Sequence, residues 1–385
     1  MVNFLNIDFQ LNVLYHDVIM KVKENLLLFF IIGFVFVILY LFFAVSSLED
    51  EFLFEPNWTV DISASTERTL SEVDDVTEVV FTQERIPFLS KEKFGYVDTN
   101  GNILFQKDYP ENNYVAISSR LWSEYVYGSS YLKIFNADNQ LLGQINEIGY
   151  PCILNDTYFL FYPGGSSFGT YTLEGSLLWK YESYLPITSF SASDAGTLIG
   201  YADGKVLYLH KDTGKKILEF YPGGSNYQVI FGTALASSGN YMGVLSGLDK
   251  QRFVLAKIQN GQVKTVFHHY LKKAIKQQTL VYFTEQEDFV YFNCGEGLGI
   301  VNLKDLTGKI VSLTGDIVQI KEFIDEELIA LLVENTDQFE IVILEKQGKK
   351  LGSFGFSAET AFIDSQKNQL FVGKDSLISC FTITQ

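Results

Sequence analysis

Two hydrophobic patterns divide the chain into a short N-terminal part and a long repetitive part. The first pattern is an unbroken apolar run that begins at Leu26 and ends at Val45, in which Tyr40 is the only side chain with a polar group. At about 1.5 Å of rise per residue, a helix of this length matches the hydrocarbon core of a bilayer. A buried core helix would normally keep one polar side, because one face meets water. We therefore predict a transmembrane helix over residues 26–45.

The charges on either side of this run predict its orientation. Lys21 and Lys23 precede it, whereas Glu49, Asp50 and Glu51 follow it. The positive-inside rule then places residues 1–25 in the cytoplasm and the rest of the chain outside it. The alternative is a cleaved signal peptide processed near residues 44–46. The apolar run is longer than an h-region of about 7 to 15 residues, and an uncleaved anchor is therefore the favoured interpretation.

The second pattern is a repeat that extends over residues 77–385. Its unit is a short β-run, a turn that ends in Gly or Asn, and a second β-run, as in FGYVDTNGNILFQ and VLYLHKDTGKKILEF. Tight hairpins need a residue with positive φ, which Gly and Asn tolerate best. The expected turn residues are Gly101, Asn139, Gly175, Gly214, Gly261, Gly308 and Gly348. Their intervals of 38, 36, 39, 47, 47 and 40 residues match the length of a four-stranded propeller blade.

The intervals have room for four strands each. Between Gly175 and Gly214, the runs SLLWKYE, ITSFSAS, TLIGYAD and KVLYLHK follow one another with Gly, Pro and Asp between them. After the blade that contains Gly348, the chain ends with only three further strands. We expect the fourth from Trp58 to Ile62, which alternates like a strand within an acidic stem at residues 46–76. With this strand the ring has eight blades, and without it seven.

The predicted fold class is therefore all-β, a seven- or eight-bladed β-propeller with eight favoured, preceded by one N-terminal transmembrane helix. The composition agrees, since 33 Phe and 22 Tyr favour strands. Only LKKAIKQQ, at residues 271–278, resembles a helix in the exported part. The predicted domains are a cytoplasmic tail (1–25), the transmembrane helix (26–45), the stem (46–76) and the propeller (77–385).

Charge and cysteine content narrow the possible partners. The chain has a net charge of −17, and nearly all of this charge lies outside residues 1–45. Such an acidic domain is a poor match for nucleic acid or for an anionic bilayer surface. The three cysteines, Cys152, Cys294 and Cys380, form no metal-binding pair or dense disulfide framework. We expect them to be buried apolar side chains, although one pair could join in an oxidising compartment.

The repeats resemble those of the PQQ-like and WD40-like propeller superfamily. GTYTLEGSLLWKYE and GKVLYLHKDTGKKILEF show the strand, the Gly-containing turn and the second apolar strand of that superfamily, which sometimes ends in Trp-Lys, here Trp179 and Lys180. The Gly-His and Trp-Asp pairs of true WD40 repeats are missing. In size and expected blade number, the chain also resembles the propeller subunit of the bacterial outer-membrane protein assembly machinery. That resemblance implies a scaffold rather than an enzyme.

The sequence contains no strong constellation of catalytic residues. The adjacent cysteines that often accompany a quinoprotein site are missing, and the carboxylates are scattered as in any acidic domain. His268 and His269 would point to opposite faces of a strand and could not share a metal ion. We predict no catalytic residue, cofactor or metal ion.

Two groups of residues are candidates for binding a partner. Arg120, Trp122 and Tyr125 begin an aromatic-rich stretch, for which core packing between blades is the default interpretation. Lys272, Lys273 and Lys276 form the single basic cluster, for which a solvated loop is the ordinary explanation. FYPGGS occurs twice, at residues 161–166 and 220–225, and each copy is best interpreted as a Pro-Gly turn.

From these features we expect a non-enzymatic scaffold or binding module of the cell envelope. It would be a single-pass inner-membrane protein with a periplasmic propeller, and its partner would be an envelope protein rather than nucleic acid. A receptor for a sugar or another small molecule is the alternative, because propeller funnels are concave and this chain is rich in aromatic residues. A quinoprotein-like enzyme ranks third.

Overall fold

A computed structural model describes residues 30–40, 53–64, 85–336 and 338–384. The chain divides into two compact units, and every described strand belongs to the unit Phe52–Thr384. The other unit contains a helix at residues 30–40. Within the residues described, no helix is both long and apolar enough to span a bilayer. The predicted span over residues 26–45 includes residues 26–29 and 41–45, which lie outside the description, as do the predicted tail and parts of the predicted stem.

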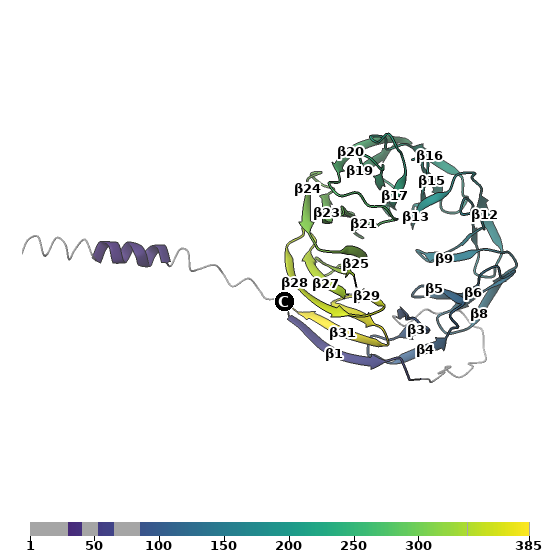
Figure 1. Cartoon of the computed structure of the whole chain (residues 1–385), viewed down its shortest axis with the longest axis horizontal. Coiled ribbons are helices and arrows are strands. Elements are labelled where there is room, and N and C mark those ends of the chain that lie inside the picture. The colour runs from purple at the N-terminus through teal and green to yellow at the C-terminus, as the bar shows by residue number, and fades with distance from the viewer. Residues whose placement is uncertain (1–29, 41–52, 65–84, 337, 385) are drawn as a thin grey trace, which may run out of the picture. The chain divides into compact units, whose positions relative to one another are not determined.

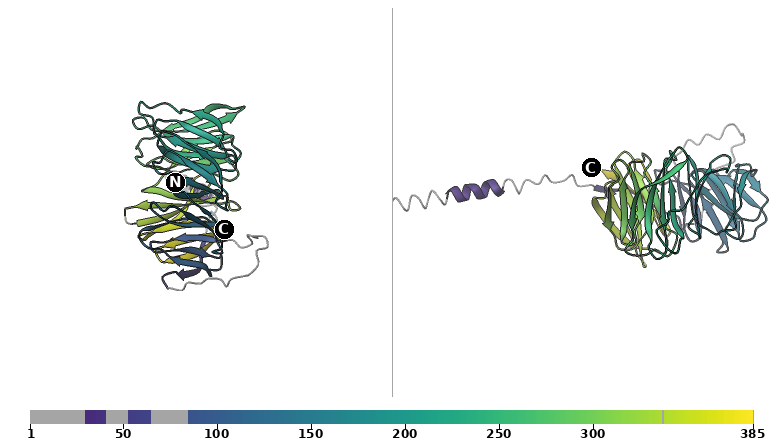
Figure 2. Two further views of the ribbon diagram at one scale, coloured as in Figure 1. Left: turned by 90° about the vertical axis from the view of Figure 1, so that its right-hand side faces the viewer. Right: turned by 90° about the horizontal axis from the view of Figure 1, so that it is seen from above.

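The strands form eight antiparallel sheets arranged in a ring, which confirms the eight-bladed propeller (Figure 1). Seven sheets have four strands each, and blade 1 has three described strands, the last of which lies at the rim of the ring, so that these are its second, third and outer strands. Seen edge-on, the ring is a thick disc (Figure 2). We number the blades in chain order and call their strands inner, second, third and outer, counted from the centre of the ring.

The strands of blades 1 to 4 have the following bounds: β2 (Ile86–Leu89), β3 (Lys93–Val97), β4 (Ile103–Asp108), β5 (Asn113–Ile117), β6 (Leu121–Val126), β7 (Leu132–Asn136), β8 (Leu141–Ile145), β9 (Tyr150–Leu154), β10 (Thr157–Phe161), β11 (Phe168–Tyr171), β12 (Leu177–Tyr181), β13 (Ile187–Ser193), β14 (Gly196–Tyr201), β15 (Val206–His210) and β16 (Lys216–Phe220). Blades 5 to 8 comprise β17 (Ile230–Leu235), β18 (Tyr241–Ser246), β19 (Arg252–Gln259), β20 (Gln262–Tyr270), β21 (Val281–Phe283), β22 (Phe289–Asn293), β23 (Gly297–Asn302), β24 (Gly308–Ser312), β25 (Asp316–Phe323), β26 (Leu328–Asn335), β27 (Gln338–Glu345), β28 (Lys350–Ser357), β29 (Ala361–Gln366), β30 (Gln369–Lys374), β31 (Leu377–Thr384) and β1 (Leu53–Asp61).

Because neighbouring strands are antiparallel, the loops of every blade alternate between two faces of the ring. The upper face carries the loops from an outer strand to the next inner strand and those between second and third strands. The lower face carries the loops between inner and second strands and those between third and outer strands. Successive blades repeat this arrangement, so loops at equivalent places in different blades gather on the same face.

Each junction between neighbouring blades holds its own apolar core. The described residues form eight clusters of buried side chains, and each cluster combines residues of two adjacent blades. Strands in the middle of a blade are buried on both sides, as in β14 and β22. Outer strands are instead mostly exposed or half-buried, as in β16, where Leu218 is the one buried residue. The blades are thus layers of one continuous core, and no single blade could bury its apolar faces alone.

Strand β1 closes the ring by pairing with β31, the last strand of the chain. The predicted closing strand is therefore confirmed, and it is longer than expected. Pro56 is tolerated because β1 is the outermost strand of blade 8, and the register shifts beside it, between Pro56 and Trp58. Two polar pairs support the ladder, from Asn57 Nδ2 to Thr382 Oγ1 (2.6 Å) and between the hydroxyls of Thr59 and Ser379 (2.9 Å).

Two tryptophans on outer strands join neighbouring blades in the same way. Trp58 Nε1 donates a hydrogen bond to the carbonyl oxygen of Thr99, and Trp179 Nε1 donates one to that of Lys211, both at 2.9 Å. Each indole lies against the turn glycine of the next blade, where a Cβ atom would come within 2.7 Å of Trp58 at Gly101 and 2.4 Å of Trp179 at Gly214. Trp58 therefore repeats the role of Trp179, which the sequence pattern did not indicate.

The predicted turn glycines are confirmed with one exception. Gly308 lies at the start of β24, and Leu306 takes the positive φ (59°) in that hairpin. Gly308 packs closely on the neighbouring blade, since an added Cβ would lie 2.5 Å from the ring of Phe267. A small residue is thus required there by the approach of an aromatic ring and not by the turn itself.

Residues 271–278 do not form a helix, although their sequence resembles one. The segment is an irregular loop between β20 and β21. The buried side chain of Gln251 binds the loop backbone, donating to the carbonyl oxygen of Ile275 (2.9 Å) and accepting from its N–H (2.6 Å). Thr279 N also donates to the carbonyl oxygen of Phe231 (2.8 Å). These tertiary hydrogen bonds replace those that a helix would have made.

Deleting residues 53–61 should destabilise the propeller strongly. The deletion uncovers the edge of β31 and removes the half-buried side chains of Phe54, Trp58 and Val60, which we expect to cost about 3–5 kcal/mol. The melting temperature should fall on the order of 10 °C. Differential scanning calorimetry measures it, with Thr59→Ala as a control that leaves the strand in place. An unchanged melting temperature would show that β1 does not hold the ring closed.

Candidate functional site

The exposed tyrosines of the propeller gather on its upper face. Each lies in an upper loop or at the upper end of a strand in blades 2 to 5, and the lower face has none among the described residues. We call this surface the tyrosine face; it comprises Tyr114, Tyr127, Tyr131, Tyr184, Tyr221, Tyr227 and Tyr270, with exposed fractions between 46% and 104%. Exposed aromatic side chains are unusual on an inert surface and are enriched at protein interfaces.

The upper loops of these blades are rich in Tyr, Pro, Gly and Ser. Examples are YGSSY at residues 127–131, ESYLP at 182–186 and YPGGSNYQV at 221–229. Both FYPGGS copies lie on the upper face. The first forms a turn between β10 and β11, as predicted, whereas the second belongs to an irregular loop after β16. Antibody loops combine the same residue types, because tyrosine gives rigid contact area and small polar residues give adaptable hydrogen bonds.

Four tyrosines form a tight cluster where blades 2 and 3 meet. Tyr114 and Tyr125 stack with ring centroids 5.5 Å apart, and Tyr150 lies 6.4 Å from Tyr125 and 5.9 Å from Tyr127. Burial raises the pKa of Tyr125, whereas hydrogen bonding to Tyr127 is the main cause of the raised pKa of Tyr150. These hydroxyls therefore stay neutral at physiological pH and can donate and accept hydrogen bonds.

A second part of the tyrosine face is held by Arg252, at the start of β19. Its Nη2 donates to the carbonyl oxygen of Pro222 (2.5 Å), and its guanidinium lies 5.6 Å from the ring centre of Tyr270. Close by, Asp249 accepts hydrogen bonds from the Nδ2 and N–H groups of Asn226 (2.8 and 3.1 Å) and from Ser225 Oγ. The hydrogen bond from Ser225 is the main cause of the lowered pKa of Asp249. The long loop after β16 is thus anchored at several points.

The predicted partner residue Trp122 does not lie on any surface. Its side chain is 1% exposed and stacks on Phe135, with ring centroids 4.2 Å apart and planes 8° from parallel. It belongs to the core between blades 1 and 2, together with Phe94 and Phe105. Trp122 is therefore a packing residue, the default interpretation of this stretch, and cannot touch a partner in the folded ring.

The other predicted partner residues are divided between the two faces. Tyr125 belongs to the tyrosine cluster, whereas Arg120 lies in a lower loop and pairs with Asp156 (3.0 Å). Lys272, Lys273 and Lys276 are exposed in the upper loop after β20, and Lys272 lies 3.5 Å from Glu296. The structure thus places Tyr125 and the lysines on the same face, over different blades, and separates Arg120 from them.

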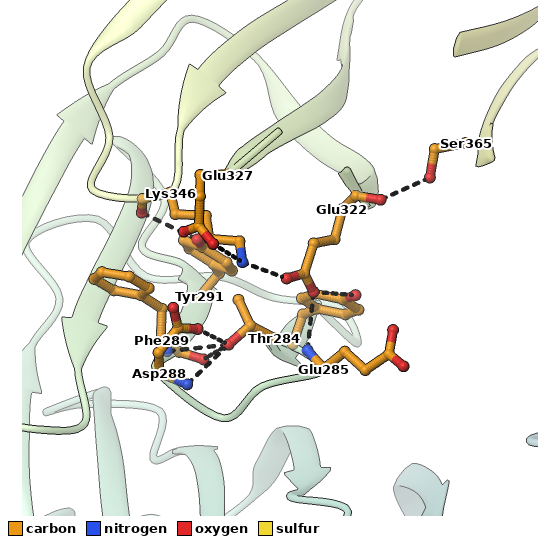
Figure 3. A network of polar contacts seen from close by, with 10 residues as sticks. Thr284, Glu285, Asp288, Phe289, Tyr291, Glu322, Glu327, Lys346 and Ser365 are labelled. Carbon is orange, nitrogen blue, oxygen red and sulfur yellow. Dashed lines mark hydrogen bonds and ion pairs between the residues drawn. The ribbon is translucent and has the colours of Figure 1, made fainter. Parts of the chain in front are cut away.

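A buried ion pair lies at the junction of blades 6 and 7, within a network of polar contacts (Figure 3). Lys346 Nζ lies 2.9 Å from Glu322 Oε1 and 3.3 Å from Glu327 Oε1, and the side chains of Lys346 and Glu322 are 2% and 3% exposed. Glu322 Oε2 also accepts hydrogen bonds from the N–H of Glu285 (2.9 Å) and from the hydroxyl of Tyr282 (3.4 Å).

This network is built to hold elements together rather than to react. Burial lowers the pKa of Lys346, but its hydrogen bond and charge interaction with Glu322 outweigh that effect and raise the pKa above its ordinary value. The amine therefore stays protonated and is not a nucleophile. The hydroxyl of Ser365 donates to the backbone carbonyl of Glu322 (2.9 Å), which extends the network to blade 8.

Histidine and cysteine side chains form no further site within the described ranges. His268 and His269 occupy consecutive positions of β20, where successive side chains point to opposite sides, and no group of three His, Cys, Asp or Glu residues is placed to hold a metal ion. Cys294 and Cys380 are buried, Cys152 is partly buried, and all three are free thiols. Burial raises the pKa of Cys152 to about 11, which keeps this thiol protonated.

Sequence reasoning did not single out Tyr114, Tyr184 and Tyr227 as surface residues. A sequence signal existed for Tyr184 and Tyr227, because both lie close to the Pro, Gly or Ser residues that separate one blade from the next. A loop can be assigned to a face only when its place within a blade is known. The turn spacing gives that place only once the blade boundaries are known. The buried Lys346 left no signal, since an isolated lysine in a turn is ordinarily exposed.

Comparisons with known proteins identify the fold. A family described as "beta-propeller protein" matches residues 20–385. An uncharacterized protein of Treponema pallidum (strain Nichols) is 29% identical over 360 residues, which cover 94% of this chain and 95% of that protein. The crystal structure of BamB from Moraxella catarrhalis is similar with a TM-score of 0.57 and 15% identity, covering 86% of this chain and 98% of that one.

The computationally designed Ika8 protein is similar to this chain with a TM-score of 0.59 and 14% identity, covering 79% of this chain and 94% of the designed one. At such identities the two solved structures share the fold alone. The predicted resemblance to the propeller superfamily is confirmed.

Replacing Lys346 by Met should destabilise the propeller by about 3–5 kcal/mol, because it leaves the carboxylate of Glu322 buried without its cation. Lys350→Met is the matched control. Lys350 pairs with Glu340 at 3.3 Å on the surface, and its loss should cost less than about 1 kcal/mol. Urea unfolding measures both variants. Equal free energies of unfolding for Lys346→Met and Lys350→Met would contradict the role assigned to the buried pair.

Proposed function

Because the chain belongs to the β-propeller protein family, we propose that it is a non-enzymatic protein-interaction module whose partner docks on the tyrosine face. The observation that carries this proposal is the segregation of exposed tyrosines to the upper face of blades 2 to 5. Propellers commonly act through loops that a rigid ring positions, and function must be argued from such a surface because the fold hosts many activities.

The chemistry of the surface supports a protein partner. Tyrosine rings bury a large area at a small cost in side-chain entropy, and tyrosine is one of the residues that most often dominate binding energy. Arg252 stacks on Tyr270 beside them, and arginine is the other polar residue enriched at such sites. With the net charge of −17, nucleic acid remains an unfavourable partner.

We place this module outside the cytoplasm, held to a membrane by residues 26–45. Support comes from the length and apolar character of that run and from Lys21 and Lys23 before it. Only a short segment separates Val45 from the closing strand that begins at Leu53. In this arrangement the partner would be another protein of the cell envelope, and the module would act as a scaffold close to the bilayer.

The test is capture of the full chain from native membranes, with a photo-crosslinking residue placed at Tyr127, Tyr184 or Tyr227. We expect all three positions to crosslink to one stoichiometric envelope protein. The triple variant Tyr127→Ser, Tyr184→Ser and Tyr227→Ser should reduce its recovery at least tenfold, as the loss of several aromatic contacts predicts.

Ile324→Ser is the control, because Ile324 is 39% exposed on the lower face. This variant should retain the partner, and a crosslinker at residue 324 should not reach it. Recovery that is equal in the triple variant and the control would contradict docking on the tyrosine face. Recovery of the chain in the soluble fraction after cell breakage would separately contradict the membrane anchor.

A further inference from the structure

A cavity lined by both apolar surface and polar groups lies at the seam where blade 8 meets blade 1, away from the tyrosine face of blades 2 to 5. Its volume is about 350 Å³, which is within the range of small-molecule sites. We call it the seam cavity. Its lining comes from four upper segments: residues 62–63 after β1, 90–93 between β2 and β3, 359–360 before β29, and 375–376 between β30 and β31. A molecule bound there would touch both chain ends of the ring.

The walls of the seam cavity are fixed by hydrogen bonds within the protein. Asp375 Oδ1 accepts from the N–H groups of Glu359 (2.8 Å) and Thr360 (2.9 Å). Ile62 N donates to the carbonyl oxygen of Ser376 (2.8 Å), and the hydroxyl of Tyr109 donates to that of Ser90 (2.6 Å). The cavity is therefore largely preformed, which lowers the cost of ordering it on binding.

The charged groups around the cavity are largely neutralised by one another. Lys91 Nζ lies 3.0 Å from Glu359 Oε2 across the seam, and Lys93 Nζ lies 3.1 Å from Asp108 Oδ1. The side chain of Lys93 is only 11% exposed. With Glu92 and Asp375, the carboxylates outnumber the two lysines, so an anion would be repelled.

The cavity instead offers many groups that bind hydroxyls. Ser63, Thr360 and Ser376 supply hydroxyl groups, and the lysines and carboxylates keep spare donors and acceptors beyond their ion pairs. In the part of the chain that the structure describes, the hydroxyl of Thr360 makes no hydrogen bond of its own. A ligand that both donates and accepts at many positions satisfies such walls without breaking an ion pair.

We propose that the seam cavity binds a neutral, polyhydroxylated molecule the size of a mono- or disaccharide. The ligand bridges blades 8 and 1 and therefore adds to the closure that β1 and β31 provide. This site is independent of the proposed protein partner, because none of its residues belongs to the tyrosine face.

Saturation-transfer NMR on the full chain tests the proposal, with D-glucose, maltose and trehalose as separate probes at millimolar concentration. Melting temperatures are a poor readout, because sugars also stabilise proteins by exclusion from their surface. We expect transfer to at least one of the three sugars. Ser376→Phe, which fills the cavity, should abolish it, whereas Ser312→Phe, at an exposed position of β24, should not.

Thr360→Val keeps the shape of the side chain and removes its hydroxyl. It should weaken binding of the same sugar about fivefold, the loss expected for one neutral hydrogen bond. Unchanged far-ultraviolet circular dichroism of the three variants shows that they fold. The proposal is overturned if no sugar receives saturation, if the signal persists in Ser376→Phe, or if putrescine binds at this site and the sugars do not.

Discussion

Pairing between β1 and β31 is the constraint on which the rest of the ring depends. Every other pairing of described strands joins neighbours in the sequence, whereas this one joins the first strand of the propeller to the last. Without it, β31 would be an open edge beside the junction of blades 8 and 1. The ring can therefore be completed only after β31 has been synthesised, and its closure requires a contact between residues more than 300 positions apart.

In the rest of the ring, stability comes from the repeated junctions between adjacent blades rather than from one central core. Each pair of adjacent blades buries its own apolar cluster, and tryptophans on outer strands bind the turn of the following blade. At the junction of blades 6 and 7, the ion pair of Lys346 and Glu322 fixes the lower loops with charge-assisted hydrogen bonds. Removing one partner of such a pair is strongly destabilising, because the other charge then stays buried without compensation.

Because the sheets and the junctions between blades stabilise the ring, the upper loops need not do so. The sheets satisfy their own backbone hydrogen bonds, and the loops need only short anchors such as those of Arg252 and Asp249. Tyrosines can then remain exposed on a rigid base without weakening the core. The lower loops contain the buried network of Lys346 and Glu322 instead, so the two faces of the disc differ in chemistry although they belong to the same repeat.

The sequence by itself determined the architecture, because an eight-bladed propeller repeats one local pattern. Turn residues such as Gly101 and Gly214 mark hairpins that form from neighbouring residues, and the unpaired end of the chain indicated that Trp58 to Ile62 would supply the missing strand. Only the tertiary structure decided which individual side chains are buried and which are exposed. Trp122 and Tyr125 lie three residues apart on β6, yet one is enclosed between two blades and the other joins the tyrosine cluster. Lys346 is buried and Lys350 is not, for the same reason: burial depends on what the next blade presents, which no local pattern contains.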